Sequence, residues 1–306
     1  MADLLLQLPT LKPWESVNLF KKAIMLYQLS DADIERFIEE DLPYGDLTTL
    51  LLGIGNISGV MTFTCREKTT ICCSEEAARV LEKCGATVNF CLQSGTTAEA
   101  GSAIIKASGT ADALHAGWKV ALNLLEYASG IATRTRNIVI RAKEVNPAIN
   151  VVSTRKSFPG TKKVALKAIM AGGALPHRLG LSESVLVFRQ HTTFIGGLDC
   201  FLQTMAILKA KTPEHKIIVE ADTAEEALKI AAAGADVVQL DKLSPQELSR
   251  LVRQLRHDAP GITISAAGGI NADNASAYAE SGVDILVLSS LYFGKPSDIA
   301  VAIAPV

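Results

Sequence analysis

The strongest constraint on the fold is a pattern that repeats through the second half of the chain. A short apolar, β-branched run ends in polar or glycine residues, and a helical segment follows it. The pattern occurs at INVVS (149–153), IIVEAD (217–222), VVQLDK (237–242), ITISAAGG (262–269) and ILVLSS (285–290). Helices are expected at 161–172, 199–211, 223–234, 244–257 and 272–281. About six such units in a row favour an α/β barrel, complete or incomplete, over an open sheet.

The first half of the chain predicts a smaller α+β domain and a long helical connection. A helix is expected to begin at Ser30, because the acidic residues that follow it stabilise a helix N-terminus, and to end near Glu40. Short strands are expected at 60–65, 68–73, 87–92 and 103–107, around a helix at 74–84. Residues 110–145 read as largely helical, with a break at Ser129-Gly130.

The bulk composition argues against two classes of partner. The formal net charge is −2 at pH 7 and no basic face stands out, so nucleic-acid binding is not expected. No apolar run reaches the ~18 residues that a membrane span requires, so no membrane partner is expected. The amino-terminal residues lack a basic segment that leads into a long apolar core. We therefore expect no signal peptide and a cytoplasmic location.

The cysteines are expected to be structural. Six of them occur, at positions 65, 72, 73, 84, 91 and 200, and no two form a Cys-x-x-Cys pair. A zinc site or a disulfide remains an alternative for the clustered ones. In a cytoplasmic chain, however, such cysteines are usually small core residues.

Two adjacent cations, Arg155 and Lys156, follow the strand at 149–153. Cations at the end of a buried strand are unfavourable unless an anion binds there. In a parallel α/β array the C-terminal strand ends share one face, and that face is where ligands bind. Lys156 has a second interpretation as a Schiff-base lysine, because the adjacent Arg155 would lower its pKa.

Two carboxylates, Glu220 and Asp241, follow the cores of consecutive strands. They are expected side by side at one end of the barrel, where they repel each other unless they share a cation. Oxygen ligands of this kind suit Mg²⁺ bound to a phosphate. The alternative interpretation is helix capping, since an aspartate between a strand and a helix is a common N-cap.

A glycine pair, Gly268-Gly269, follows Ala267 and precedes a helix expected from Ala272. Glycines before a helix let backbone N–H groups approach an anion, and the helix dipole favours negative charge. The next strand ends in Ser289-Ser290, which adds hydroxyl donors. Late strands of a βα barrel often hold a phosphate in this way, although a glycine pair can also mark only a tight turn.

His177-Arg178 is the last candidate group. Arg178 offers a planar fork for a carboxylate or phosphate, and His177 could donate a hydrogen bond to either. As an isolated pair these residues are more often a surface feature.

Together these motifs resemble those of the nicotinate-nucleotide pyrophosphorylases, also called quinolinate phosphoribosyltransferases. The resemblance extends from about residue 30 to residue 290, and it is specific because the motifs occur together. The matching motifs are Glu40-Asp41 with Gly45-Asp46-Leu47-Thr48-Thr49, Leu122-Asn123 with Ser129-Gly130-Ile131-Ala132-Thr133, Thr154-Arg155-Lys156 with Pro159-Gly160, His177-Arg178-Leu179-Gly180-Leu181, Leu240-Asp241 and Gly268-Gly269-Ile270-Asn271. The stretch at 176–183, with 186–188, is similar to the ModD branch of that family, which is associated with molybdenum transport systems.

The resemblance implies a fold and an assembly. The fold class is α/β, an incomplete α/β (TIM-like) barrel with an N-terminal α/β sandwich domain. The implied divisions are an N-terminal extension at 1–29, the sandwich domain with connecting helices at 30–145, the barrel phosphoribosyltransferase domain at 146–290, and a C-terminal tail at 291–306 that packs on the first domain. The family forms homodimers whose sandwich domain covers the partner's barrel, so the active sites would be shared.

The resemblance also implies a reaction: transfer of phosphoribose from phosphoribosyl pyrophosphate to a carboxylated nitrogen-ring acceptor, with Mg²⁺ as the cofactor. Arg155, Arg178 and His177 would bind the acceptor's carboxylate. Lys156 would hold the donor, while Glu220 and Asp241 would act at its ribose and Mg²⁺-pyrophosphate. The implied phosphate-binding residues are Ala267, Gly268, Gly269, Ser289 and Ser290.

Three positions depart from the family's pattern. Lys119 stands where the pyrophosphorylases have an arginine, Phe188 where they have a lysine, and Ala174 where they have a third glycine. Both Lys119 and Phe188 are expected at the acceptor. A lost charged hydrogen bond costs ~1.5–3 kcal/mol, so a dicarboxylate should bind less well here. We therefore expect a phosphoribosyltransferase whose acceptor is quinolinate or a different carboxylated ring.

Two other functions compete with this one. A non-catalytic phosphate- or oxyanion-binding regulator linked to molybdate transport would use the same cations. It has little use for Glu220 and Asp241, however, because a bare anion sensor gains nothing from two carboxylates. An aldolase that uses Lys156 is the other alternative, which borohydride trapping with a ketose phosphate would detect.

Overall fold

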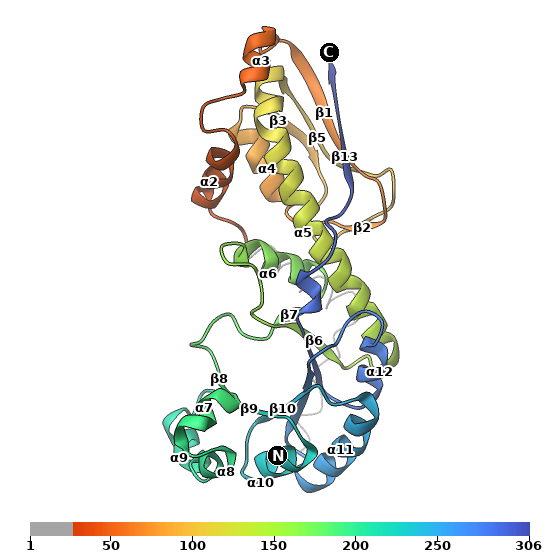
Figure 1. Cartoon of the computed structure of the whole chain (residues 1–306). Helices are drawn as coiled ribbons and strands as arrows, with labels where there is room; N and C mark the ends of the chain where they lie inside the picture. Colours follow the sequence, from red (N-terminus) through yellow and green to blue (C-terminus); the bar gives the residue numbers. More distant parts are fainter. Residues whose placement is uncertain (1–26) are drawn as a thin grey trace, which may run out of the picture. The chain divides into compact units, whose positions relative to one another are not determined.

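The computed structural model describes residues 27–306, which form two compact units. The first unit holds the residues up to Thr133, together with 166–173 and 296–306. The second holds 134–165 and 174–295. Most of the expected N-terminal extension, at 1–29, lies outside the described residues. Figure 1 shows the element labels used below.

A four-stranded antiparallel sheet forms the centre of the first unit. Its strand order is β13 (Ile299–Pro305), β1 (Ser58–Cys65), β5 (Ala103–Thr110) and β3 (Thr87–Cys91). A separate pair is formed by β2 (Thr69–Thr70) and β4 (Thr97–Ala98). In β1 the buried residues alternate, as a strand with one covered face requires: Met61, Phe63 and Cys65 are all buried. The last residues of the chain thus complete a sheet that its first half begins.

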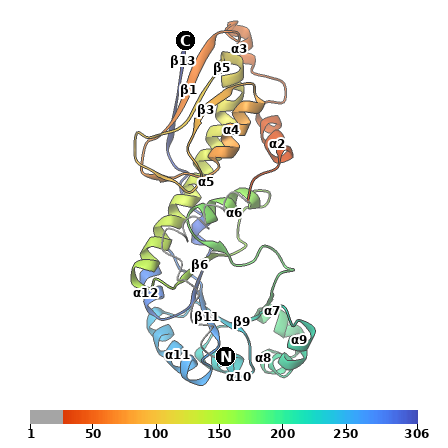
Figure 2. The ribbon, with the colours of Figure 1, turned by 180° about the vertical axis from the view of Figure 1, so that it is seen from behind.

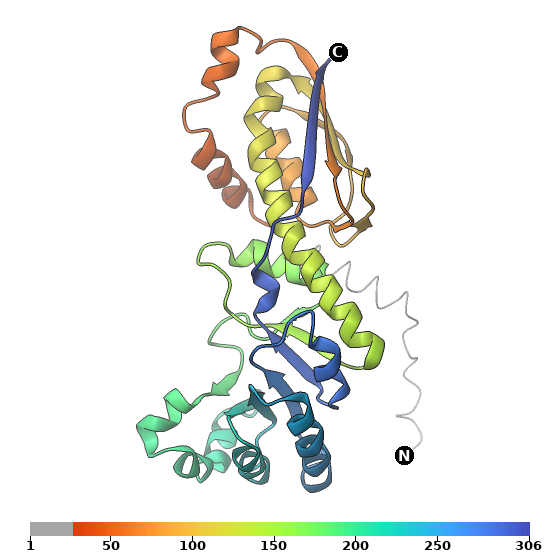
Figure 3. The same ribbon diagram turned by 45° about the vertical axis from the view of Figure 1, so that its right-hand side comes forward.

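Helices cover one face of this sheet. Figure 3 shows α4 (Ser74–Lys83) and the first part of α5 (Ala111–Val145) on that face. The two helices approach closely at Gly117, where an added Cβ would lie 3.3 Å from the Cα of Leu81. The short helices α2 (Asp31–Asp41) and α3 (Leu47–Leu52) precede the sheet. Each has a polar N-cap: Ser30 accepts from the backbone N–H of Asp33 in a capping box, and Asp46 caps α3.

The predicted break at Ser129-Gly130 is wrong, because α5 is continuous from residue 111 to residue 145. Ser129 is fully buried, and its hydroxyl oxygen accepts a hydrogen bond from the backbone N–H of Cys72 at 3.0 Å. Thr133, one turn further on, accepts from the backbone N–H of Thr70 at 2.9 Å. These side chains satisfy backbone groups of the segment that follows β1. The small polar residues therefore serve packing rather than a turn.

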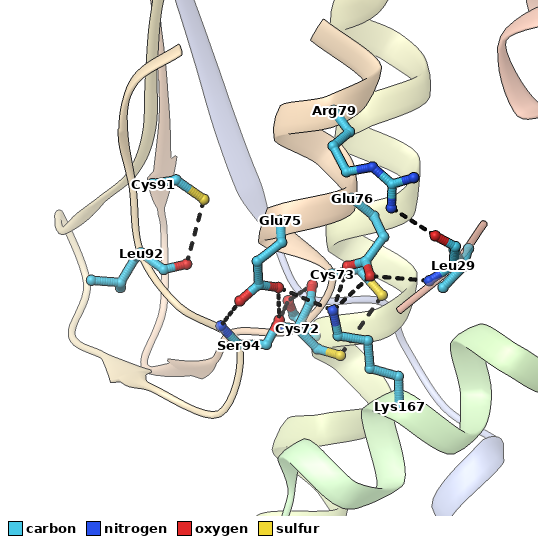
Figure 4. A network of polar contacts seen from close by, with 11 residues as sticks. Leu29, Cys72, Cys73, Glu75, Glu76, Arg79, Cys91, Leu92, Ser94 and Lys167 are labelled. Carbon is cyan, nitrogen blue, oxygen red and sulfur yellow. Dashed lines mark hydrogen bonds and ion pairs between the residues drawn. The ribbon is translucent and has the colours of Figure 1, made fainter. Parts of the chain in front are cut away.

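A buried ion-pair network joins α4 to the part of α6 (Lys162–Ala171) that belongs to the first unit (Figure 4). The Nζ atom of Lys167 lies 2.7 Å and 2.6 Å from the two carboxylate oxygens of Glu76, and 3.1 Å from Glu75. The side chain of Glu76 is 0% exposed and that of Lys167 is 2% exposed. The charges are therefore fully desolvated, and each depends on the other.

Glu75 extends this network to a neighbouring loop. Its two oxygens accept hydrogen bonds from the backbone N–H of Ser94 at 2.8 Å and from the Ser94 hydroxyl at 2.5 Å. Burial alone would raise the pKa of Glu75, but the charge of Lys167 and the Ser94 hydrogen bonds outweigh it and lower the pKa. Glu75 is thus held ionised beside the buried lysine.

The second unit is built on a curled sheet of seven parallel strands. The strands are β6 (Asn150–Ser153), β7 (Leu175–Pro176), β8 (Val185–Val187), β9 (Ile217–Ala221), β10 (Val237–Asp241), β11 (Thr263–Ala267) and β12 (Ile285–Leu288). They pair in the order β7-β6-β12-β11-β10-β9-β8. A closed barrel would also require β7 to pair with β8. Within residues 27–306 these two strands are not paired with each other. The expected incomplete α/β barrel is confirmed.

Helices follow most of these strands, and Figure 2 shows α11 and α12 on the outer side of the sheet. The helices after β9, β10 and β11 are α10 (Ala224–Ala232), α11 (Pro245–Asp258) and α12 (Ala275–Glu280). A capping box at Ser244, with proline at the next position, fixes the start of α11. These crossover connections keep the strands parallel, so the C-terminal ends of all the strands lie at one edge of the sheet.

The single helix predicted at 199–211 is wrong. The chain after β8 forms α7 (Arg189–Thr192), a 3₁₀ turn η1 (Thr193–Ile195), α8 (Leu198–Leu202) and α9 (Met205–Lys211). The break between α8 and α9 is at Thr204, whose hydroxyl donates to the carbonyl of Phe201 at 2.7 Å. Such local side-chain bonds compete with the helical hydrogen bonds.

The cysteines are all free thiols. Cys65, Cys72 and Cys73 are buried, as expected of core residues, whereas Cys200 is exposed on α8, contrary to the expectation. Within residues 27–306 no helix combines the length and the apolar character needed to cross a bilayer.

The buried network gives a direct test of what stabilises the first unit. Lys167→Met keeps the apolar stem but leaves Glu76 buried without its cation. Removing one partner of a buried ion pair costs about 3–5 kcal/mol, so the free energy of unfolding should fall by that amount in a urea titration followed by circular dichroism. Lys209→Met, which breaks the partly exposed pair with Asp236, is the matched control and should cost less than about 1 kcal/mol. Equal losses would show that the buried network has no special role.

Candidate active site

One cavity of about 900 Å³ opens at the C-terminal strand ends of the second unit, and residues of that unit alone line it. Every candidate residue except Lys119 lines this cavity: Arg155, Lys156, His177, Arg178, Phe188, Glu220, Asp241, Ala267, Gly268, Gly269, Ser289 and Ser290. Lys119 lies on α5 in the first unit, where its Nζ atom is 5.7 Å from the centre of the Trp118 ring. The parallel sheet therefore gathers residues that are up to 135 positions apart in the sequence.

The loop after β6 brings Arg155 and Lys156 to the cavity. Its first residue, Thr154, is fixed through the backbone: its N–H donates to Leu288 at 2.9 Å, and its carbonyl accepts from the Tyr292 hydroxyl at 2.7 Å. Arg155 and Lys156 are both exposed to the cavity, and neither side chain makes a hydrogen bond to another described residue. Two cations are thus held in place without a protein anion.

Arg178 is the most constrained cation of the site. It is only 9% exposed, and its guanidinium makes no hydrogen bond to another residue within the described part of the chain. Burial lowers the pKa of Arg178, the nearby charge of Arg155 lowers it further, and the charge of Glu183 opposes the shift without reversing it. A buried guanidinium beside a second cation is unfavourable unless an anion binds between them.

Beside these cations lies a less polar wall. His177 is half-buried, and burial, with the charge of Arg178, lowers its pKa, so its imidazole is neutral at pH 7. Leu186 and Phe188 line the same cavity, and the Phe188 ring stacks on His191 with 5.8 Å between ring centres. This side of the cavity can therefore accept a flat ring that carries a carboxylate.

Glu220 and Asp241 reach the cavity from the neighbouring strands β9 and β10. Gln239 lies between them in the sheet and donates from Nε2 to Glu220 at 2.8 Å. Burial raises the pKa of Glu220, the Gln239 hydrogen bond opposes the rise, and the charge of Asp241 adds to it. Asp241 accepts a hydrogen bond from the Nζ atom of Lys242 at 2.5 Å. The two carboxylates are therefore close enough to affect each other's charge, and Lys242 forms its ion pair with Asp241.

This carboxylate pair fits a magnesium ion that arrives with phosphate. Within residues 27–306 no cluster of three or more histidine, cysteine, aspartate or glutamate side chains could hold a metal alone. Mg²⁺ in phosphate-handling sites is usually bound by one or two carboxylates together with the substrate's phosphates. Beside these carboxylates, the buried Oε1 atom of Gln239 has no hydrogen-bond partner, so it is available to accept a hydrogen bond from a bound ligand or from water on the metal.

The Gly268-Gly269 turn lines the cavity next to Asp241. Both glycines have left-handed backbones, with φ of 86° and 72°. The Asn274 side chain donates to the carbonyl of Gly269 at 3.1 Å, and the Ser290 hydroxyl donates to Ile270 at 2.9 Å. Because the proton of Ser290 is already used, Ser289 is the hydroxyl that is free to donate to a bound phosphate.

The helix expected to begin at Ala272 begins instead at Ala275 and has six residues. Side chains of Asn271 and Asn274 bond to backbone N–H groups at 273 and 271, both at 2.8 Å, and form turns that replace the first helical bonds. Any phosphate at this position would thus be bound by the backbone of the turn rather than by a long helix dipole.

Two residues of the site escaped the sequence analysis. Gln239 is a buried polar residue inside an apolar strand, two positions before Asp241, so alternation along the strand could have placed it on the same face. Lys242 lines the cavity next to Asp241, and its positive φ of 59° has no signature in the sequence.

The fold and the cavity define an α/β-barrel protein with cations and paired carboxylates at its strand ends. Two family models match the chain: "Quinolinate phosphoribosyl transferase, N-terminal domain" at residues 46–129 and "Quinolinate phosphoribosyl transferase, C-terminal domain" at residues 131–302. The chain therefore belongs to the quinolinate phosphoribosyl transferase family, which confirms the resemblance seen in its motifs.

Individual relatives agree with this assignment. The ModD protein of Rhodobacter capsulatus is 44% identical over 257 residues, which is 84% of this chain and 98% of the relative. A ModD protein of Escherichia coli is 36% identical over 277 residues, covering 90% of this chain and 98% of the relative. The solved nicotinate-nucleotide pyrophosphorylase of Francisella tularensis has a TM-score of 0.82 at 22% identity, over 91% of this chain and 99% of that chain. At that identity the structural likeness concerns the fold.

The close packing around Gly268 predicts that this position tolerates no side chain. An added Cβ would lie 2.6 Å from the Oδ1 atom of Asp241 and 2.6 Å from the Cγ atom of Lys242, on a left-handed backbone. Gly268→Ala should lower the free energy of unfolding by more than about 1 kcal/mol in a urea titration. Gly261→Ala, where no atom lies within 4 Å, is the matched control and should be nearly neutral. A neutral Gly268→Ala would contradict the described packing of the turn.

Proposed function

We propose that the protein is a phosphoribosyltransferase that transfers phosphoribose from phosphoribosyl pyrophosphate to the ring nitrogen of a carboxylated acceptor and releases pyrophosphate. One observation carries the proposal: a single cavity joins unpaired cations, paired carboxylates and a glycine turn. A phosphorylated sugar diphosphate needs all three, because it has two separate anionic ends and a diphosphate that binds Mg²⁺. The family and the ModD relatives support the same reaction class.

The donor is proposed to span the cavity. Its 5′-phosphate would bind to the backbone of Ala267-Gly268-Gly269 and to the Ser289 hydroxyl, and its diphosphate would face Lys156 and the two carboxylates. Glu220 would contact the ribose hydroxyls, and Glu220 and Asp241 would hold the magnesium ion. When bound, Mg²⁺ would supply positive charge that stabilises the departing diphosphate.

The acceptor is proposed to bind on the other side. Arg155 and Arg178 would bind its carboxylate. The negative charge of the carboxylate would offset the repulsion between the two neighbouring guanidiniums. Neutral His177 can donate to a second acceptor oxygen without adding charge. Phe188 would contact the face or edge of the ring. The catalytic work of these residues is to fix the ring nitrogen opposite the ribose C1 atom, where positive charge develops as the diphosphate leaves.

No covalent link to the protein is required in this mechanism. The acceptor nitrogen forms its bond to C1 with its own electron pair, and the C1–oxygen bond to the diphosphate breaks with its pair on the leaving group. If the acceptor is quinolinate, the ring carboxylate would then leave as CO₂, its C–C electron pair would stay on the ring carbon, and a proton from water would replace it; Arg155 would lie near that carboxylate. Exclusion of water by the acceptor ring prevents hydrolysis of the donor.

A homodimer with shared active sites belongs to this proposal. Lys119 does not line the cavity of the second unit, although its position in the motif at 119–123 assigns it to the acceptor. In a homodimer, Lys119 of the partner subunit would supply a cation to the site. Sedimentation equilibrium tests the assembly, and a monomer that turns over its substrates would contradict it.

The function itself is tested by screening carboxylated nitrogen rings, quinolinate included, for release of pyrophosphate from phosphoribosyl pyrophosphate and Mg²⁺. Acceptor-dependent release is the expected result. A protein that binds phosphate and molybdate yet releases no pyrophosphate with any acceptor would be the oxyanion-binding regulator instead.

Donor binding should stabilise the fold. Millimolar phosphoribosyl pyrophosphate with Mg²⁺ is expected to raise the Tm by several degrees, because a ligand at about 100 times its Kd adds about 2.7 kcal/mol. Asp241→Asn removes one carboxylate charge and should reduce the rise by at least half. Asp258→Asn, at the end of α11 and outside the cavity, is the control and should keep the full rise. An undiminished rise in Asp241→Asn would remove Asp241 from the donor site.

Acceptor choice is expected to depend on Phe188. Phe188→Lys restores the cation that the pyrophosphorylases have, and should raise kcat/KM for quinolinate by about tenfold or more, the value of one charged hydrogen bond. Phe194→Lys introduces the same change at a 90% exposed residue that does not line the cavity and should have no effect. An unchanged or lower rate in Phe188→Lys would mean that Phe188 does not contact the acceptor.

A further inference from the structure

Lys242 has an unusual backbone for a lysine. Its φ is 59°, in the left-handed region, and within residues 27–306 only Cys73 among the other non-glycine residues has a positive φ. This conformation is unfavourable for a residue with a long side chain, whereas glycine or asparagine adopts it readily. Strained backbones persist where the surrounding structure enforces them, and they cluster at functional sites.

The surroundings of Lys242 enforce this conformation. Its backbone N–H donates to the carbonyl of Ala267 at 2.8 Å, which fixes it to the end of the adjacent strand. Gly268 packs directly on it, since a Cβ at that glycine would lie 2.8 Å from the Lys242 nitrogen. The residue that follows β10 and the turn that follows β11 therefore pack against each other.

The side chain returns to the residue before it. The Nζ atom of Lys242 donates to the Oδ2 atom of Asp241 at 2.5 Å, and Glu220 and Asp222 lie within electrostatic reach of the same ammonium. Lys242 is 79% exposed, and exposed ion pairs of this kind add little stability. Stability alone therefore does not explain why a lysine, rather than glycine or asparagine, occupies a left-handed position.

The location supplies an explanation. Lys242 lines the cavity between the carboxylate pair and the Gly268-Gly269 turn, and its ammonium neutralises the carboxylate that a metal would need. A diphosphate carries more negative charge than one carboxylate and offers more acceptor oxygens, so it competes well for this ammonium. A flexible, exposed lysine can exchange one partner for the other without movement of the backbone.

We propose that Lys242 is a diphosphate-binding residue, held on Asp241 in the free protein and transferred to the diphosphate end of the sugar donor when the donor binds. This inference rests on the proposed function and adds a residue to it. When the Lys242 ammonium moves to the diphosphate, the Asp241 carboxylate loses its ion pair and can bind the Mg²⁺ that accompanies the diphosphate. In the free protein the same ion pair keeps Mg²⁺ alone from binding well to Glu220 and Asp241.

The test uses isothermal titration of the full chain with inorganic pyrophosphate, with Mg²⁺ alone and with ribose 5-phosphate. Lys242→Asn removes the ammonium but tolerates the left-handed backbone, so the fold is kept, as the Tm will verify. Lys242→Arg keeps the charge. Lys211→Asn makes the same chemical change at an exposed lysine at the end of α9, outside the cavity, and serves as the matched control.

The Lys242→Asn change is expected to weaken pyrophosphate binding and to strengthen the binding of Mg²⁺ alone. Lys242→Asn should bind pyrophosphate at least tenfold more weakly and Mg²⁺ alone several-fold more tightly, with ribose 5-phosphate affinity within threefold of the parent protein. Lys242→Arg and Lys211→Asn should stay within threefold for pyrophosphate. Unchanged pyrophosphate affinity in Lys242→Asn overturns the inference, and so does an equal loss of ribose 5-phosphate affinity, which would indicate a general charge effect.

These outcomes separate the inference from the proposed function. Acceptor-dependent pyrophosphate release by the parent protein, with unchanged pyrophosphate affinity in Lys242→Asn, would leave the function standing and remove Lys242 from it. Loss of affinity in Lys242→Asn, with no release from any acceptor, would keep the diphosphate site and remove the transferase. A parent protein that binds no pyrophosphate with or without Mg²⁺ would overturn both.

Discussion

The site depends on like charges that the parallel sheet gathers at one edge. Arg178 is almost fully buried within electrostatic reach of Arg155, and neither guanidinium forms an ion pair with a carboxylate among residues 27–306. On the neighbouring strands β9 and β10, the charges of Glu220 and Asp241 repel each other, and Gln239 donates a hydrogen bond to Glu220. Each arrangement is unfavourable in the empty protein, and a ligand with anionic ends and a metal-binding middle relieves all of them together.

The incomplete closure of the barrel shapes this cavity. Strands β7 and β8 have only two and three residues and are not paired with each other in the described chain. The eight residues between them, 177–184, occupy the gap and begin with His177-Arg178. Among the residues that line the cavity, His177 and Arg178 thus come from the open side of the sheet, whereas Glu220, Asp241, Gly268 and Ser289 lie at the ends of its regular strands β9 to β12.

The sequence predicted which strand-end residues line the cavity, because the signals for these positions are local. Lys156, Glu220, Asp241 and Gly268 each follow an apolar run, and a parallel sheet necessarily brings such positions together. The structure added what no local pattern contains: the backbone of Lys242, the pairing of Gln239 with Glu220, and the short strands on either side of 177–184. The break predicted in α5 failed for a related reason. Ser129-Gly130 predicts a helix break from local composition, but Ser129 lies inside a continuous helix, where its hydroxyl accepts a hydrogen bond from the backbone N–H of Cys72.

The most direct measurement of the central claim is a crystal structure of the protein with ribose 5-phosphate, pyrophosphate and Mg²⁺. The account predicts the sugar phosphate on the Gly268-Gly269 turn and the pyrophosphate between Lys156 and the carboxylates of Glu220 and Asp241, within the one cavity. Density for either ligand at a different surface, or an empty cavity at saturating concentrations, would contradict it.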